Sequence, residues 1–188
     1  MDYKNKAFES ETFSNIDFSE KSFRNSSFNH TTFDNCNISN IDLLNSKFIN
    51  VKFNNCKLMG LNFSECNKLI ISFNFKNSLI KMTNFSDLDL KDTLFEDCQI
   101  IDCDFFETNL ARSKFTNSNL KGTRFLNANL NFASFKDAKS YTINPTQNTL
   151  RKTRFSSPEV ISLLDIFDIE IDWDIFSALF KNKEYSLF

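Results

Sequence analysis

The sequence predicts an all-β solenoid, because three features recur along it every five residues. Large apolar side chains, most often Phe, return at this spacing across most of the chain. The period matches neither the 3.6 residues of an amphipathic helix nor the two residues of an alternating strand. Each five-residue unit must therefore turn the chain and direct one large side chain inward. These central residues are Phe8, Phe13, Phe18, Phe23, Phe28, Phe33, Ile38, Leu43, Phe48, Phe53, Leu58 and Phe63, then Ile80, Phe85, Leu90, Phe95, Ile100, Phe105, Leu110, Phe115, Leu120, Phe125, Leu130 and Phe135.

The other two features flank each central residue. Two positions before it the side chain is small or modestly apolar, as at Ser26, Cys36 and Thr83. Residues two apart in an extended segment share a side, so the small residue leaves room for the large one. Two positions after it stands Asn or Gly in many units, as at Asn25 and Gly60, and both tolerate the positive φ of a tight corner. Each unit thus forms one side of a four-sided coil.

The rhythm breaks in two places within the repeats. Around residues 66–75 the expected central residue is Lys68, which cannot lie unpaired in a dry core, and the frame shifts by two between Phe73 and Phe75. A bulge or short projecting loop is predicted there. At the beginning, Lys6 and Glu11 occupy inward positions, which predicts a frayed or polar first coil.

The repeat pattern ends near residue 140, which predicts two parts: a β-helix over 1–140 and a capping or dimerisation segment over 141–188. In the second part, residues 156–159 (Ser-Ser-Pro-Glu) resemble a capped helix start followed by an amphipathic helix. Residues 168–173 alternate strictly between acidic and apolar and predict a strand. Asp174 is expected to cap a last helix.

Composition favours a soluble cytoplasmic protein that is not an enzyme. The first ten residues lack a signal-peptide core, and the five Cys occupy small inward positions, where packing is their expected role. The chain has one His, His30, at a corner, and no paired CxxC, nucleophile elbow or glycine-rich phosphate loop. We therefore expect no metal, no cofactor and no catalytic residues, and no apolar run predicts contact with a membrane.

Charge is unevenly distributed, although the formal net charge is only −2. An acidic band over residues 84–107 is followed by a basic stretch over 108–140. Five acidic residues share the corner position and are predicted to ring one coil, and we call them the acidic girdle: Asp87, Asp92, Asp97, Asp102 and Glu107. Two interpretations are open. The two bands neutralise each other on a solvated surface, or the acidic band binds a basic groove of a partner that normally holds nucleic acid. No long basic stripe is visible along the sequence, so direct nucleic-acid binding is not expected.

Two apolar residues are predicted to lie together on the outside of the coil. Phe106 and Leu126 each follow a central residue and are 20 positions apart, so they should stack on one outer face. Such a pair favours a partner contact or a cover supplied by the C-terminal segment.

The five-residue pattern resembles that of the pentapeptide repeat proteins, which form a right-handed quadrilateral β-helix. The resemblance covers residues 6 to 140. The later stretches 141–145, 154–164 and 169–171 are similar to the C-terminal module of the quinolone-resistance (Qnr-type) and microcin-immunity subgroup. That resemblance implies a two-fold homodimer whose interface lies in the C-terminal segment, with these contact residues: Pro158, Val160, Ile161, Leu163, Leu164, Ile169 and Ile171.

The same resemblance implies a function: binding the bacterial type II topoisomerases gyrase and topoisomerase IV by imitating DNA, with protection from quinolones or peptide toxins. Three features depart from the subgroup: residues 173–188 extend the tail, no long loop insertion is evident, and only one coil is strongly acidic. The alternative is a structural or adaptor rod that binds another protein without DNA mimicry.

Overall fold

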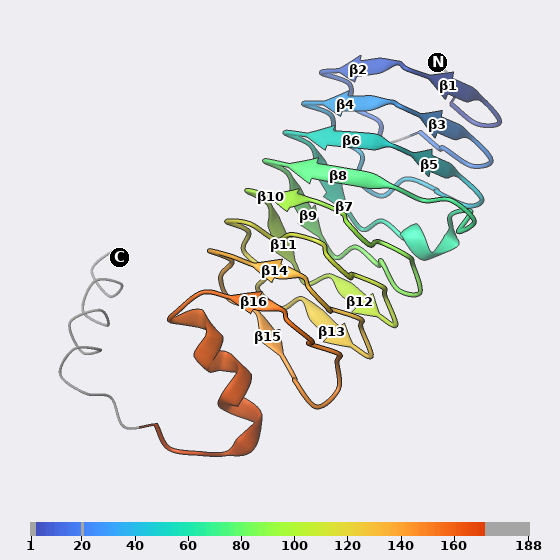
Figure 1. Ribbon diagram of the computed structural model, residues 1–188. Coiled ribbons are helices and arrows are strands. Elements are labelled where there is room, and N and C mark those ends of the chain that lie inside the picture. The colour runs from blue at the N-terminus through green and yellow to red at the C-terminus, as the bar shows by residue number, and fades with distance from the viewer. Residues whose placement is uncertain (1–2, 20, 172–188) are drawn as a thin grey trace.

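The protein is a right-handed, four-sided β-helix in which successive coils stack into a rod, as the sequence predicts (Figure 1). The computed structural model describes residues 3–19 and 21–171. All strand pairs are parallel, and most partners are 20 residues apart, as in Phe8↔Phe28 and Phe33↔Phe53. We number the four faces 1 to 4 in the order in which the chain visits them.

Short strands on each face pair with the coil above and the coil below. Face 1 contains β1 (Ala7–Glu9), β3 (Ser27–Asn29) and β5 (Lys47–Ile49). Face 2 contains β2 (Thr12–Ser14), β4 (Thr32–Asp34), β6 (Val51–Asn54), β8 (Phe73–Lys76), β10 (Phe95–Glu96), β14 (Ser134–Phe135) and β16 (Arg154–Phe155). Face 3 contains β7 (Lys57–Met59), β9 (Leu79–Lys81) and β11 (Gln99–Ile101). Face 4 contains β12 (Asp104–Phe106), β13 (Arg124–Leu126) and β15 (Thr142–Ile143).

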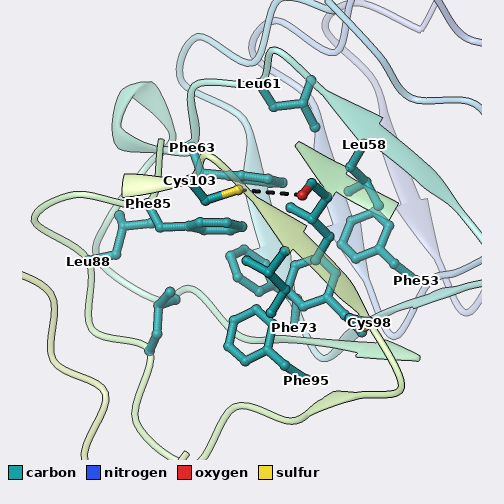
Figure 2. Close-up of a cluster of buried hydrophobic side chains, with 14 of the residues drawn as sticks. Phe53, Leu58, Leu61, Phe63, Phe73, Phe85, Leu88, Phe95, Cys98 and Cys103 are labelled. Atoms are coloured by element: carbon teal, nitrogen blue, oxygen red, sulfur yellow. Dashed lines mark hydrogen bonds between the residues drawn. The ribbon is translucent and has the colours of Figure 1, made fainter. Parts of the chain in front are cut away.

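The core is a set of side-chain columns that run along the rod. On face 2 the rings of Phe75, Phe95 and Phe115 stack nearly parallel, with centroids 5.1 Å and 4.7 Å apart. A second column on face 4 joins Phe85 to Phe105 at 4.9 Å. Rings of the opposite faces 2 and 4 meet edge to face across the core, a favoured aromatic geometry (Figure 2). The core is therefore filled with side chains, and the predicted central residues form it.

The corners confirm the predicted conformation. Asn25, Asn35 and Asn45 all have φ between 53° and 57°, in the left-handed region that Asn tolerates better than most residues. In the second half the same conformation is imposed on Asp, Glu and Arg, and even on Met82 and Phe132. Backbone hydrogen bonds from coil to coil thus determine the corner, whatever residue occupies it.

The predicted irregularity at 66–75 is an insertion of two residues in one coil. Val51 pairs with Phe73 and Lys57 with Leu79, so partners here are 22 residues apart instead of 20. The loop projects after the 3-10 helix η1 (Phe63–Glu65), with Leu69 90% exposed and Ile70 63% exposed.

Phe73 fills the interior that this loop leaves vacant. It stands two positions before Phe75, where other units have a small residue, and is only 2% exposed. Its ring lies 5.1 Å from that of Phe63 and 5.2 Å from that of Phe75 (Figure 2). The Lys68 side chain points outward to Asp87 and does not occupy this space.

The coil continues past residue 140, where the sequence pattern ends. Phe125 pairs with Ile143 and Phe135 with Phe155, so the parallel ladder reaches β16. The next element, the 3-10 helix η2 (Glu159–Phe167), lies against the end of the rod (Figure 1). The Ser162 hydroxyl joins it to the coil by donating to the Tyr141 carbonyl at 3.1 Å.

Two predictions for the C-terminal segment are wrong in detail. No serine caps η2: its N-cap is Pro158, and the Ser156 hydroxyl instead accepts a hydrogen bond from the Asp137 backbone N–H at 3.0 Å. Residues 168–171 form no strand, because Asp168 is left-handed (φ 48°) and turns the chain away from any open strand edge. The helix predicted from Asp174 lies outside the described residues.

Candidate protein-interaction surface

The acidic girdle occupies corners, as predicted, but it does not form one ring of equal charges. All five residues have positive φ between 53° and 61°. The Asp87 N–H donates to the carbonyl of Phe106, the residue before Glu107, so these two acids stack on one corner in successive coils. Asp92, Asp97 and Asp102 occupy the other three corners.

Cations neutralise two of the five girdle carboxylates. The Lys68 ammonium lies 2.7 Å from Asp87, and the Arg112 guanidinium binds Asp92 through two bonds of 2.7 Å. The hydrogen bonds from Arg112 are the main reason that the pKa of Asp92 is lowered. These contacts place basic residues of the loop and of the next coil over the band that was predicted to be acidic.

The remaining girdle acids have no ion pair within the described residues. Asp97 accepts a hydrogen bond from the Asn117 amide at 3.2 Å, and the Asp102 carboxylate lies over Gly122. A Cβ at Gly122 would come within 2.2 Å of Asp102 Oδ1, so this Gly leaves the space that the carboxylate uses. Glu107 is exposed. The exposed negative charge of the girdle is thus concentrated at Asp97, Asp102 and Glu107.

Neighbouring acids of the band outside the girdle are paired in the same way. Arg124 Nε lies 2.5 Å from Asp104, Lys76 3.4 Å from Glu96 and Lys91 3.3 Å from Asp89. These individual ion pairs are not predicted from the sequence. The signal is nevertheless present in the 20-residue spacing that separates Arg112 from Asp92 and Arg124 from Asp104.

Two large apolar side chains lie side by side on the outside of the second half of the rod. Phe106 and Leu126 are register partners on face 4, 40% and 38% exposed. With Asn84, Ser86 and the Asp104–Arg124 ion pair they line a shallow surface hollow. Exposed apolar side chains also occur in the loop, at Leu69 and Ile70, so two apolar patches flank the acidic band.

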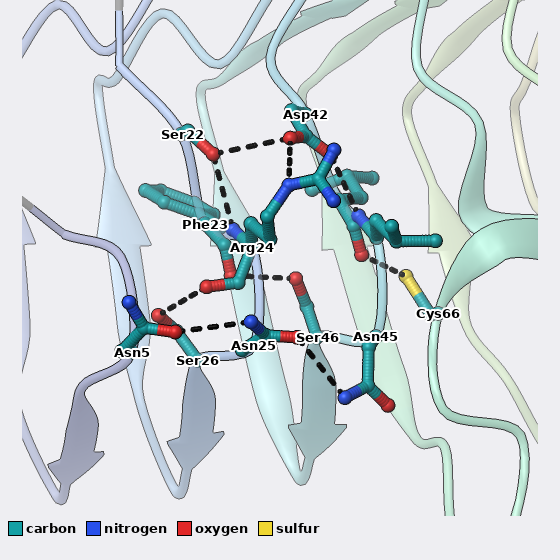
Figure 3. Close-up of polar contacts among 12 residues, drawn as sticks. Asn5, Ser22, Phe23, Arg24, Asn25, Ser26, Asp42, Asn45, Ser46 and Cys66 are labelled. Atoms are coloured by element: carbon teal, nitrogen blue, oxygen red, sulfur yellow. Dashed lines mark hydrogen bonds and ion pairs between the residues drawn. The ribbon is translucent and has the colours of Figure 1, made fainter.

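The first half of the rod presents a different surface. Its corners are joined by amide ladders: the Asn25 side chain donates to Asn5 at 3.0 Å, and Asn45 donates to Asn25 at 3.1 Å (Figure 3). Its clearest ion pair joins Arg24 to Asp42 at 2.7 Å (Figure 3). Burial by neighbouring groups would raise the pKa of Asp42, but hydrogen bonds from the Leu44 N–H and from Arg24 outweigh it and lower that pKa.

The predicted dimer residues divide into two groups. Val160, Ile161 and Leu163 are partly buried, and Leu163 packs against the protein's own core. Pro158, Leu164, Ile169 and Ile171 are exposed, the last three at 39%, 55% and 37%. Leu163 therefore already has a structural role within one chain.

The described residues offer no site for metal or thiol chemistry. No group of three or more His, Cys, Asp or Glu side chains that could hold a metal ion occurs among them. The five cysteines are free and buried, and burial raises the pKa of Cys98 and Cys103 to about 12. Among the described helices, none has the length and apolarity needed to cross a membrane.

The protein is a filled β-helix with charged and apolar patches on its outer surface. Residues 6–85 match the family model "Pentapeptide repeat region", and residues 61–125 match the model of the SV2A/B/C luminal domain. The same five-residue pattern continues to residue 135, so the similarity to pentapeptide repeat proteins extends beyond the matched residues. Among curated proteins, no sequence matches.

Solved structures confirm the fold. A trypsin-treated, singly substituted form of QnrB1, described as a plasmid-mediated fluoroquinolone resistance protein, aligns at a TM-score of 0.66 with 16% identity, over 91% of this chain and 93% of that one. Full-length QnrB1 aligns at 0.49 with 16% identity, over 90% and 94%. A pentapeptide repeat protein of the Arabidopsis thaliana thylakoid lumen aligns at 0.29 with 14% identity, over 70% and 69%. The first alignment supports a common architecture over most of the chain, and the fold assignment rests on that alignment alone.

Proposed function

We propose that this protein binds a bacterial type II topoisomerase, gyrase or topoisomerase IV, and protects it from quinolones or peptide toxins. The observation that carries the proposal is the architectural match to QnrB1 over 91% of the chain, C-terminal segment included. The resemblance to the Qnr-type subgroup is the reason that we name a type II topoisomerase as the partner. In this proposal the protein acts by occupying a DNA-binding surface and catalyses nothing itself.

The contact is expected to use the exposed girdle acids and the apolar residues beside them. Asp97, Asp102 and Glu107 present exposed carboxylates that are in no ion pair among the described residues, and such groups complement a surface that binds phosphates. Phe106 lies next to Glu107 and is 40% exposed, which adds an apolar contact. Asp87 and Asp92 contribute less, because Lys68 and Arg112 neutralise them.

The test is binding of the full-length protein to purified gyrase at rising salt. Asp97→Asn with Asp102→Asn removes two charges while keeping side-chain shape and tolerance of positive φ. The proposal expects wild-type binding to weaken steeply with salt and the double variant to bind several-fold less tightly at low salt. The matched control, Glu11→Gln with Asp34→Asn, removes the same charge far from the girdle. Equal binding by both variants would rule out the acidic contact.

A second candidate function, an adaptor rod without DNA mimicry, is favoured by the neutralisation of the acidic band. Five of its carboxylates are in ion pairs, at Asp87, Asp89, Asp92, Glu96 and Asp104. An adaptor would dock through Phe106 and Leu126 or through the loop. Its binding would be insensitive to salt and lost in a Phe106→Ser, Leu126→Ser variant.

We also propose that the protein forms a homodimer through its C-terminal segment. Leu164, Ile169 and Ile171 are exposed, and the area they offer is apolar. Leu164→Glu with Ile169→Glu should convert a dimer into a folded monomer in sedimentation analysis, whereas Leu163→Glu should also destabilise the fold. A double variant that still sediments as a dimer would place the interface elsewhere.

A further inference from the structure

The coil gathers lysines that are far apart in the sequence onto two neighbouring faces. Face 2 and face 3 meet at a corner that contains Asn117. In the second half of the rod, six lysines project from these faces on either side of that corner, and we call them the lysine surface: Lys76, Lys114 and Lys136 on face 2, and Lys81, Lys121 and Lys139 on face 3.

The ladders establish this grouping. Lys114 bridges to Leu94 and to Ser134 on face 2, and Lys139 bridges to Asn119 on face 3. The Lys121 carbonyl accepts the Asp102 N–H, which places Lys121 one coil beyond Ile101 in the row that contains Lys81. With coils about 4.8 Å apart, each face carries three lysines spread over four successive coils, with Glu96 and neutral residues between them.

The lysine surface differs from the rest of the rod in how its charges are compensated. On faces 1 and 4, several bases are held by acids: Arg24, Lys68, Lys91, Arg112 and Arg124. Of the six lysines, only Lys76 lies within ion-pair distance of an acid among the described residues, Glu96 at 3.4 Å. The acids on this side are Glu96 and, at the shared corner, Asp97 and Asp137. A net positive surface therefore exists on a protein whose overall charge is −2.

We propose that the lysine surface binds the phosphate backbone of duplex DNA. Several cations distributed along a stiff rod complement a linear polyanion, and such contacts are not specific for sequence. The described exposed aromatic side chains, Phe106, Phe132 and Phe167, lie outside these two faces, so there is no platform on which single-stranded bases would stack.

The corner geometry favours DNA over a membrane. A flat lipid surface meets only one face of a four-sided rod at a time. The two backbones that border a DNA groove can meet lysines on both sides of a corner, and the major groove is about 12 Å wide. The sequence alone predicts no direct nucleic-acid binding, because residues about 20 apart that share a face appear there as isolated lysines.

The experiment measures binding of a short fluorescent DNA duplex to the full-length protein by anisotropy, from about 50 mM to about 200 mM salt. Wild-type protein is expected to bind with a dissociation constant of about 10⁻⁴ to 10⁻⁶ M and to weaken as salt rises. Lys114→Glu with Lys121→Glu should lower the slope of log K against log salt by about two. The control, Lys47→Glu with Arg151→Glu, changes net charge equally on face 1 and should leave the slope unchanged.

Every other result overturns the proposal. No wild-type binding at the lower salt concentration would show that the lysines are only solvated. Equal losses in the two double variants would show a response to net charge instead of to this surface. Sedimentation with phosphatidylserine-rich vesicles without DNA binding would assign the surface to a membrane. Circular dichroism confirms that both variants keep the β-helix, so a folding defect is not mistaken for lost binding.

Discussion

The two halves of the rod have the same core and different surfaces. Before the loop at 66–71, coils are joined outside by amide ladders such as Asn5–Asn25–Asn45. After it, the equivalent corners carry charge, and arginines reach one coil back to pair with Asp92 and Asp104. Inside, the phenylalanines of face 2 stack through both halves without a change of geometry. The coil therefore depends on inward residues and tolerant corners, which leaves the outer positions free to specialise.

The largest expected effect comes from breaking the shared core. Phe95 is fully buried and stacked on both sides, so Phe95→Ala should cost about 3–5 kcal/mol of unfolding free energy. Phe13 is partly exposed in the first coil, so Phe13→Ala should lower the unfolding free energy clearly less than Phe95→Ala does. Equilibrium denaturant unfolding of both variants measures the difference. Similar losses would mean that the first coil is as tightly packed as the middle.

Removing the arginines that pair with acids in the second half tests whether the exposed charge of that half determines binding. Arg112→Gln with Arg124→Gln frees Asp92 and Asp104, and should strengthen binding to gyrase about two- to tenfold at low salt if charge imitation is the mechanism. Arg24→Gln frees Asp42 in the first half and should have no effect on binding. Weaker binding by the double variant would show that the arginines themselves contact the partner.

Acid should destabilise both halves through paired carboxylates. The pKa values of Asp42 and Asp92 are lowered in the folded protein, so their stabilisation is present above their unfolded pKa of about 3.9 and is lost as pH falls through the folded values. Unfolding curves between about pH 6 and pH 2 should show this loss. Asp42→Asn should be less stable than wild type near neutral pH and lose less stability on acidification. An unchanged pH profile would show that Asp42 contributes nothing to this dependence.

The smallest effect is expected at the loop between the halves. Leu69→Ser with Ile70→Ser makes the exposed loop polar without changing its length. Because both side chains are exposed, stability should change by less than about 0.5 kcal/mol. Thermal unfolding followed by circular dichroism measures it. A large loss would reveal that the loop supports the core, most directly by positioning Phe73.

Most of the fold could be predicted from the sequence, because each five-residue unit contains a large inward residue, a small inward residue and a corner residue at fixed positions. The central residues, the small inward residues and the corner residues were all correctly placed. Phe73 was harder to interpret, since its burial depends on the space that Lys68 vacates. The end of the ladder at Phe155 was also missed, because residues after 140 form a coil through pairing with the coil before them, without the repeat pattern.

The candidate surfaces were only partly predictable. Phe106 and Leu126 follow from the 20-residue period, and so do the girdle corners. Neutralisation of Asp87 by Lys68 depends on the loop, whose path the sequence does not specify. The lysine surface requires knowing which face each unit occupies after a two-residue insertion, and that becomes clear only in three dimensions.

A gyrase supercoiling assay titrated with this protein, with and without a quinolone, tests the central functional claim most directly. We expect the protein to rescue supercoiling in the presence of the drug, or to inhibit the enzyme directly in its absence. Asp97→Asn with Asp102→Asn should weaken either effect more than Glu11→Gln with Asp34→Asn does. No effect at tens of micromolar protein, in a range where dimer and fold are intact, would contradict the topoisomerase proposal and leave an adaptor rod.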